Sequence, residues 1–207
     1  MVYRTTAKMA KRKESHRAKL LETALRQFGK QGYHATTVPR IVRESGSSTG
    51  AFYFYFRNKE DVFARVLEFI GEQIARALNE AIGAAGQEPI TQMKAAMSGF
   101  IQYLVEHPEE SRILIVESSG LGGKLEGARR AIIASHTRSV ERALAGMSRA
   151  LPALDPKTAA SCWVGAVHEA VRQWLEAPAE TRIAPEKLAK EICGFNLRAI
   201  GMPAANP

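Results

Sequence analysis

Apolar residues recur at intervals of three and four along most of this chain, and that periodicity restricts its fold more than any other feature. Residues 13–31 carry a stripe with the spacing of one helix face, made of Leu20, Leu21, Ala24, Leu25 and Phe28. Later stripes of the same period are separated by prolines and glycines, which end helices. The sequence therefore predicts an all-α fold.

The expected helices follow from these stripes and from residues that cap a helix. Thr36 or Thr37 can begin the second helix, and Ser48 can cap a short third one. Asn58 can cap a long fourth helix, with Asp61 as its capping-box partner. Further helices are expected over residues 90–107, 109–117, 125–147, 157–175 and 185–200.

One aromatic segment conflicts with this pattern when it is taken alone. The run Phe52-Tyr53-Phe54-Tyr55-Phe56 alternates two residue types that are common in strands. A lone strand would leave backbone groups unpaired, and the neighbouring sequence offers no partner strand. The cap and the stop on either side therefore favour a helix, which places Phe52 and Phe56 together on its buried side.

Positive charge is concentrated in the first third of the chain. Residues 1–60 contain 13 basic and 4 acidic side chains, a net charge of +9, whereas residues 61–207 contain 16 basic and 17 acidic ones. A basic module joined to a neutral body is typical of proteins that bind a polyanion. The most N-terminal basic residues form either an arm that reaches the polyanion or a solvated tail, and they are Arg4, Lys8, Lys11, Arg12 and Lys13.

Two short helices joined by a tight turn that contains glycine, behind a basic helix, describe a helix-turn-helix. The first helix must brace the second, and the second must offer one face to the major groove of DNA. Gly50 and Ala51 are small enough to let that face approach base edges. We therefore expect residues 1–60 to form a three-helix DNA-binding domain with a basic arm, and residues 61–207 to form a helical bundle.

The segments Thr36–Val42, Ser45–Phe56 and Asn58–Asp61 together resemble the DNA-binding domain of the tetracycline-repressor (TetR) family. The resemblance implies an all-helical homodimer whose N-terminal domain binds a palindromic operator and whose C-terminal domain binds a small effector. It also implies that the effector moves the long fourth helix and so changes the separation of the two reading helices. Ser47 departs from the family, which often has an apolar residue in the turn.

The expected DNA contacts surround the third helix. Tyr53 and Tyr55 carry hydroxyl groups suited to phosphate oxygens, although a packing role is the alternative for both. Phe54 can pack on thymine methyl groups, and Lys59 can hold a phosphate at the start of the fourth helix. The full set is Thr37, Ser48, Thr49, Gly50, Ala51, Tyr53, Phe54, Tyr55 and Lys59.

The remaining two thirds of the chain contain no motif with a defined mechanism. One helical stripe of methionines and an aromatic residue suits either a core or the wall of an adaptable apolar pocket. A small, largely apolar effector is expected there, with Met93, Met97, Phe100, Tyr103, Arg112, Trp163 and His168 as candidate contacts.

Small and apolar residues near the C-terminus suit either a core within one chain or a dimer interface, and the resemblance implies a four-helix interface between two chains. The candidate interface residues are Ala159, Ala166, Ala170, Trp174, Ile192 and Phe195.

Enzymatic and membrane functions find no support in the sequence. The G-x-S-x-G match at residues 46–50 follows a helix, whereas a nucleophile elbow follows a strand. Gly122-Gly123-Lys124 lacks the upstream glycine of a phosphate loop. We expect no catalysis, no cofactor and no bound metal. The absence of a long apolar run and the two widely spaced cysteines favour a cytoplasmic protein without a membrane span.

The sequence thus predicts an effector-responsive transcriptional regulator, in particular a repressor, that binds a palindromic operator as a homodimer. The alternative is a constitutive architectural DNA-binding protein that uses its C-terminal domain only for assembly. An effector that abolishes operator binding distinguishes the two hypotheses.

Overall fold

The computed structural model describes residues 2–147 and 154–202, and all regular elements in these two ranges are helical, as predicted. The first four helices are α1 (Val2–Ala35), α2 (Val38–Ser45), α3 (Thr49–Tyr55) and α4 (Lys59–Ala84). They are followed by α5 (Pro89–Glu106), α6 (Pro108–Arg112), the π-helical segment η1 (Ile113–Glu117), α7 (Gly123–Gly146), α8 (Pro156–Glu176), the short 3-10 helix η2 (Ala179–Thr181) and α9 (Pro185–Ala199).

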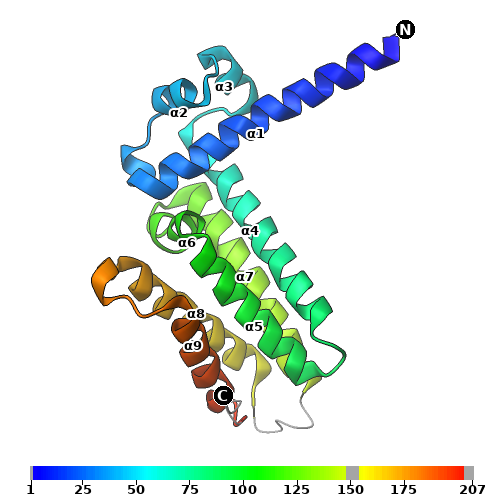
Figure 1. Cartoon of the computed structure of the whole chain (residues 1–207), viewed down its shortest axis with the longest axis vertical. Helices are drawn as coiled ribbons and strands as arrows, with labels where there is room; N and C mark the ends of the chain where they lie inside the picture. The colour runs from blue at the N-terminus through cyan, green and yellow to red at the C-terminus, as the bar shows by residue number, and fades with distance from the viewer. Residues whose placement is uncertain (1, 148–153, 203–207) are drawn as a thin grey trace.

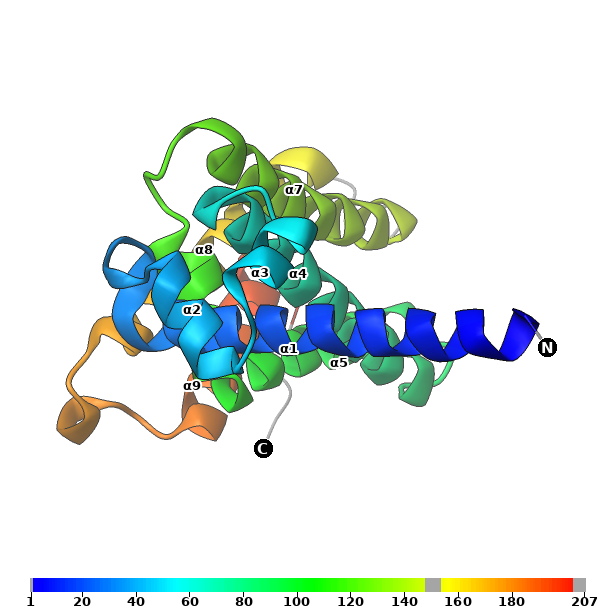
Figure 2. The ribbon, with the colours of Figure 1, turned by 90° about the horizontal axis from the view of Figure 1, so that it is seen from above.

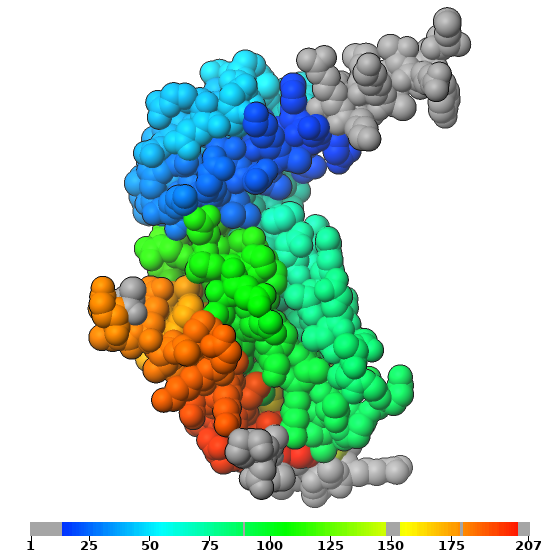
Figure 3. Space-filling view, viewed as in Figure 1, coloured from blue at the N-terminus to red at the C-terminus, as the bar shows by residue number. Residues whose placement is uncertain are grey.

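The helices are arranged as a head on an elongated bundle (Figure 1). Helices α1, α2 and α3 form the head, and α4 leads from it down the length of the bundle. Seen from above, α1 crosses the end of the bundle, with α2 and α3 on its outer side (Figure 2). The space-filling view shows that the head rests on the end of the bundle (Figure 3).

The head is held together by the stripe predicted from the sequence. Leu20 and Phe28 of α1 are fully buried, and so is Phe52 of α3. The ring of Phe28 meets that of Phe63 edge-to-face, with the ring centroids 4.8 Å apart. Phe63 lies on α4, so the first turns of α4 belong to the core of the head. Each such fully buried side chain stabilises the fold by about 1.5–3 kcal/mol.

Local hydrogen bonds fix the ends of the short helices. Gly46 ends α2 in the left-handed conformation, with φ of +62°, which glycine adopts without steric cost. The Ser48 side chain accepts a hydrogen bond from the Ala51 amide at 3.1 Å and so begins α3. At the start of α4, the Asn58 side chain accepts from the Asp61 amide at 2.8 Å. The capping roles of Ser48 and Asn58 were predicted from the sequence.

The start of α2 shows which of two candidate residues occupies the cap position. Thr37 is the N-cap residue, although its side chain makes no capping hydrogen bond. The Thr36 hydroxyl is instead buried and donates to the carbonyl oxygens of Gln27 and Gly32, at 3.2 and 2.8 Å. Thr36 therefore closes the end of α1.

The bundle is also held together by apolar stripes of its helices. Helix α4 buries one stripe, which comprises Val62, Phe63, Val66, Leu67, Ile70 and Ile74. The single helix expected over residues 109–117 is divided into α6 and η1, because the backbone widens after Arg112. None of the helices in the two described ranges has both the length and the apolarity needed to cross a membrane.

Candidate functional site

Helix α3 separates its aromatic residues between the core and the solvent. Phe52, and Phe56 just after the end of the helix, are 0% and 1% exposed. Tyr53 and Phe54 are 55% and 67% exposed. Water disfavours large apolar side chains, so two adjacent exposed aromatic residues on one short helix mark an interaction surface. The aromatic run is helical, as the sequence analysis predicted.

The other predicted DNA contacts lie around this exposed face. Thr37, Ser48 and Thr49 are exposed. A Cβ atom added to Gly50 would have the Ser48 hydroxyl oxygen as its nearest neighbour, 4.0 Å away, so this end of the helix is open. Ala51 and Tyr55 are half-buried. The arrangement presents the end of a short helix and two exposed rings, a shape that fits the major groove of DNA.

Lys59 is already bound to the end of α1. Its Nζ atom donates to the carbonyl oxygens of Tyr33 and His34, at 2.9 and 3.4 Å, and lies 4.3 Å from the centre of the Tyr33 ring. Burial lowers the pKa of Lys59 from its usual value. An ammonium group has three donors, so two of them stabilise the head and one is available for a phosphate.

The side chains of the predicted basic arm, from Arg4 to Lys13, lie outside the described side chains. Their backbone continues α1 as a helix. Two further basic residues near α3, Arg43 on α2 and Arg57 in the turn before α4, are exposed. The sequence analysis did not single them out, because isolated arginines on a polar face carry no pattern.

A second site is an elongated cavity of about 820 Å³ along the bundle, and some of its lining residues, such as Ser135 and Arg142, are exposed to solvent. Its apolar lining includes Met93, Met97, Phe100 and Trp163, four of the predicted effector contacts. Helix α4 adds the apolar residues Leu78 and Ile82, which were not among the predicted effector contacts. The lining on α7 extends from Ala128 to Gly146, a span of about 27 Å at 1.5 Å per residue. The cavity therefore suits an elongated, mainly apolar molecule.

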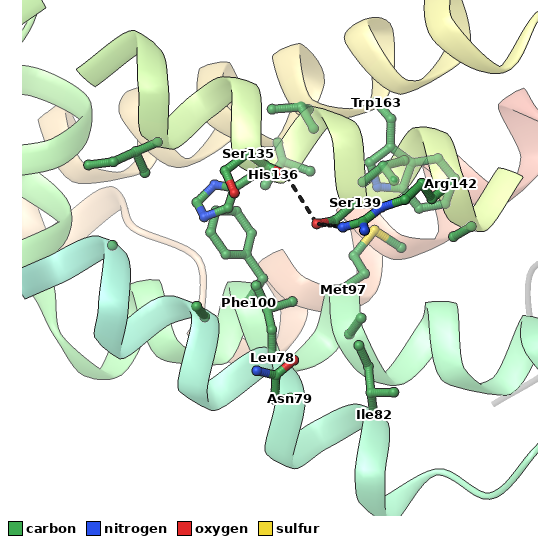
Figure 4. A pocket seen from close by; sticks show the side chains of 18 of the residues that line it. Leu78, Asn79, Ile82, Met97, Phe100, Ser135, His136, Ser139, Arg142 and Trp163 are labelled. Atoms are coloured by element: carbon green, nitrogen blue, oxygen red, sulfur yellow. Dashed lines mark hydrogen bonds between the residues drawn. The ribbon is translucent and has the colours of Figure 1, made fainter. Parts of the chain in front are cut away.

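Helix α7 gives the cavity a polar side that the sequence analysis missed. Ser135, His136, Ser139 and Arg142 all line it. In Figure 4, His136 lies beside the ring of Phe100, and Arg142 lies further along the cavity, near Met97. The centroids of the His136 and Phe100 rings are 5.2 Å apart. The sequence pattern of these residues is the same as that of an ordinary solvent-exposed helix face, so it does not indicate a ligand site.

Three predicted effector contacts do not line this cavity. The Tyr103 hydroxyl donates to the carboxylate of Glu110. Arg112 pairs with Glu117 at 3.3 Å, on the side of the bundle that meets the head. His168 lies behind the lining, where its ring stacks on that of Phe100 with the centroids 6.1 Å apart. Tyr103 and Arg112 thus bind other side chains of the bundle, while His168 reaches the cavity only through its contact with Phe100.

The predicted dimer residues lie on α8 and α9 and differ in their exposure. Phe195 is 58% exposed, and the three alanines Ala159, Ala166 and Ala170 are half-buried. The Trp174 indole donates to the carbonyl oxygen of Ile183 at 3.0 Å. Ile192 is buried within the chain. Phe195 is therefore the exposed member of this set.

The sequence and the fold both match known proteins. Residues 20–66 match the family described as bacterial regulatory proteins, tetR family. The chain is 32% identical over 101 residues to YuxN of Bacillus subtilis, described as an uncharacterised HTH-type transcriptional regulator. That match covers 48% of this chain and 34% of YuxN, so the chain spans about a third of the length of this curated relative.

Two solved structures resemble most of this fold. FadR of Bacillus subtilis in complex with stearoyl-CoA aligns with a TM-score of 0.75 and 19% identity, over 86% of this chain and 96% of FadR. AibR in complex with isovaleryl coenzyme A and operator DNA aligns with a TM-score of 0.71 and 20% identity, over 87% of this chain and 97% of AibR. At these identities the likeness concerns the fold.

Proposed function

We propose that this chain, which belongs to the TetR family of helix-turn-helix transcriptional regulators, is an effector-responsive repressor that binds a palindromic operator as a homodimer. The family is one of transcriptional regulators and not of enzymes. In this proposal residues 1–60 bind DNA, and residues 61–207 bind the effector and dimerise.

The observation that carries the DNA-binding proposal is the division of α3 into a buried and an exposed face. Phe52 anchors the helix, while Tyr53 and Phe54 project from the head. The net charge of +9 over residues 1–60 supplies attraction to the phosphate backbone. The phosphate contacts then supply affinity, and the exposed face of α3 supplies sequence preference.

The test is selection of duplexes from a random-sequence DNA library by the full chain. We expect an enriched inverted repeat whose half-sites lie about 34 Å apart or a multiple of that. A double variant, Tyr53→Ala with Phe54→Ala, keeps the buried face of α3 and is expected to lose the enrichment. Recovery of the same motif by this variant would contradict the proposed reading face.

For the effector we propose an acyl compound that occupies the cavity between α4, α5, α7 and α8. The length and apolar lining of the cavity support this class. FadR and AibR, whose folds resemble this one, were solved with stearoyl-CoA and isovaleryl coenzyme A. An effector changes operator binding only if it binds one conformation more tightly than the other.

The effector proposal is tested by adding acyl-CoAs of increasing chain length to the chain bound to its selected operator. We expect at least one of them to raise the thermal midpoint of the free protein and to release the DNA. If none does either, the constitutive architectural protein is the better hypothesis.

The dimer proposal rests on the exposed Phe195 of α9, a helix that packs against α8. A large apolar side chain that is 58% exposed in one chain is expected to be covered in the assembly. Light scattering should give a dimer for the unmodified chain and a monomer for Phe195→Glu. A monomer for both would refute the proposal.

A further inference from the structure

Three buried side-chain nitrogens lack a hydrogen-bond partner within the described ranges, and all three lie on α7 and α8. They are Nε of Arg129, Nδ1 of His136 and Nε2 of His168. A buried polar atom without a partner is costly, and such atoms are rare in folded proteins. Their occurrence on two adjoining helices beside one cavity calls for a common explanation.

The geometry connects these nitrogens to the cavity. His136 is part of its lining, and the His136 and His168 rings both contact Phe100 of α5. Arg129 lies seven residues before His136 on α7, which places both on one side of that helix. Arg129 and His136 are also close enough to His168 to contribute to the lowering of its pKa, which burial itself lowers most. The three residues form one cluster, hereafter the nitrogen cluster.

The charge of the nitrogen cluster indicates what it can bind. The Nε–H of an arginine is always a donor, and each neutral imidazole carries one N–H. The nearby carboxylate of Glu126 is shared, because its Oε1 atom pairs with Arg129 at 3.5 Å and with Arg130 at 3.2 Å. The positive charge of Arg129 therefore disfavours a cationic group, and the His136 ring, which lines the cavity, has one N–H to donate to an acceptor.

The α4 side of the cavity limits how much negative charge the ligand can bring. Glu68 and Glu72 of α4 also line the cavity and are exposed, and Glu68 pairs with Arg65 at 2.8 Å. An uncharged oxygen meets no repulsion from these carboxylates. A carbonyl oxygen at the head of an apolar chain therefore suits both the apolar lining and a donor on the His136 ring, which lines the cavity.

We infer that His136, which lines the cavity and belongs to the nitrogen cluster, donates to the carbonyl oxygen of an acyl group whose hydrocarbon chain lies along Met93 and Met97. This rests on the proposed function, because it specifies how the proposed effector is held. A thioester presents this oxygen without charge, whereas a fatty acid presents it on a negatively charged carboxylate, and the two sources are separated experimentally.

The binding test compares probes that differ in this oxygen. Decanoyl-CoA is set against S-decyl-CoA, a thioether without the carbonyl oxygen, and decanoate against decanol, by calorimetry on the full chain. We expect the carbonyl compound of at least one pair to bind about tenfold more tightly than its partner. The pair that discriminates identifies the source as thioester or free acid.

Two variants locate the discrimination. His136→Phe keeps a ring of similar size and is expected to abolish the tenfold preference, because the donor is removed. Met97→Leu, on the apolar wall, is expected to weaken the binding of both members of a pair alike and to keep the preference.

Equal binding of both members by the unmodified chain would overturn the inference and leave the proposed effector function intact. Failure of all four probes to bind would contradict the proposed effector class itself, and the inference with it.

A second measurement tests the nitrogen cluster without any ligand. An apolar ring in place of an unpartnered imidazole removes a desolvation cost, so His136→Phe is expected to raise the thermal midpoint of the free protein by about 2–4 °C. A purely structural histidine would give the opposite result. A lowered midpoint together with an unchanged preference for the carbonyl compound would overturn the inference.

Discussion

His136 and His168 show how burial within the bundle controls the charge of single side chains. Burial lowers the pKa of each to about 4, and for His168 the neighbouring His136 and Arg129 add to the effect. The ordinary pKa of histidine is about 6.5. Between these two values the unfolded chain binds protons that the folded chain does not, so the stability of the fold decreases as the pH falls.

We therefore expect the free energy of unfolding to decrease from pH 7 to pH 5 by about 1–2 kcal/mol for each of these histidines. Urea unfolding at the two pH values measures it. His136→Phe and His168→Phe should each reduce the pH dependence, whereas Met97→Leu should leave it unchanged. A pH dependence that survives both histidine substitutions would contradict the role of burial.

Lys59 combines two roles in one side chain. Its ammonium group closes the end of α1 through Tyr33 and His34, and one donor remains for DNA. Lys59→Met keeps the aliphatic stem and removes the charge, so it is expected to destabilise the fold by about 1–2 kcal/mol. It should also weaken binding to all DNA sequences alike.

Urea unfolding and the salt dependence of DNA binding test the two roles of Lys59 separately. The loss of one phosphate contact in each protomer should reduce the slope of log affinity against log salt by about 0.9 per contact. Arg65→Met is the control, because Arg65 pairs with Glu68 on the bundle. A changed sequence preference in Lys59→Met would count against a phosphate contact.

At the scale of single helices, α3 offers a matched pair of substitutions. Phe52→Ala leaves a cavity in the head and is expected to cost about 3–5 kcal/mol of stability. Phe54→Ala removes an exposed ring, so its effect on stability should stay within about 0.5 kcal/mol. The Phe54 variant should instead change which bases are preferred in the DNA selection. If both variants change only the stability, α3 is not the reading helix.

Most helices could be predicted from the sequence because their ends are determined locally. Ser48 and Asn58 cap their own helices, and a fully buried Phe52 outweighs the strand preference of the aromatic run. The division between α6 and η1 could not be predicted in this way. Ile113, Leu114 and Ile115 are consecutive and all buried. Only their surroundings in the fold decide how the backbone accommodates three neighbouring core residues.

The cavity shows a similar division between local and tertiary information. Its apolar wall, with Met93 and Met97, follows from a helical stripe that is visible in the sequence. Its polar wall on α7 depends on which face of α7 turns toward α4 and α5, and periodicity alone does not indicate this. His136 and Arg142 were missed for that reason.

At the scale of the whole molecule, the carboxylate of Glu117 is one of the contacts that join the head to the bundle, beside the pair between Lys30 and Glu109. The Oε2 atom of Glu117 accepts a hydrogen bond from the Tyr33 amide at 3.0 Å, and its Oε1 atom pairs with Arg112 at 3.3 Å. Gly32, with φ of +82°, lets the carboxylate approach, because an added Cβ atom would lie 2.6 Å from Oε2. Glu117 ends η1, which contacts both α4 and α8. The same two helices line the cavity.

A shift of α4 or α8 around a ligand can thus move η1, and Glu117 can carry that movement to α1. We expect Glu117→Ala to keep most of the affinity for the selected operator and to reduce the fold-change in that affinity caused by an acyl-CoA that releases the DNA. Glu117→Gln keeps an acceptor for the Tyr33 amide and loses the ion pair with Arg112, so its fold-change should be intermediate.

The quantity to compare is the ratio of operator affinities with and without ligand, because coupling between two sites is a free-energy difference of typically about 1–3 kcal/mol. Glu169→Ala is a suitable control, since Glu169 is exposed on α8 and pairs with Arg172. If the ratio for Glu117→Ala equals that of the control, the signal does not depend on Glu117, and α4, whose first turns belong to the core of the head, is an alternative route.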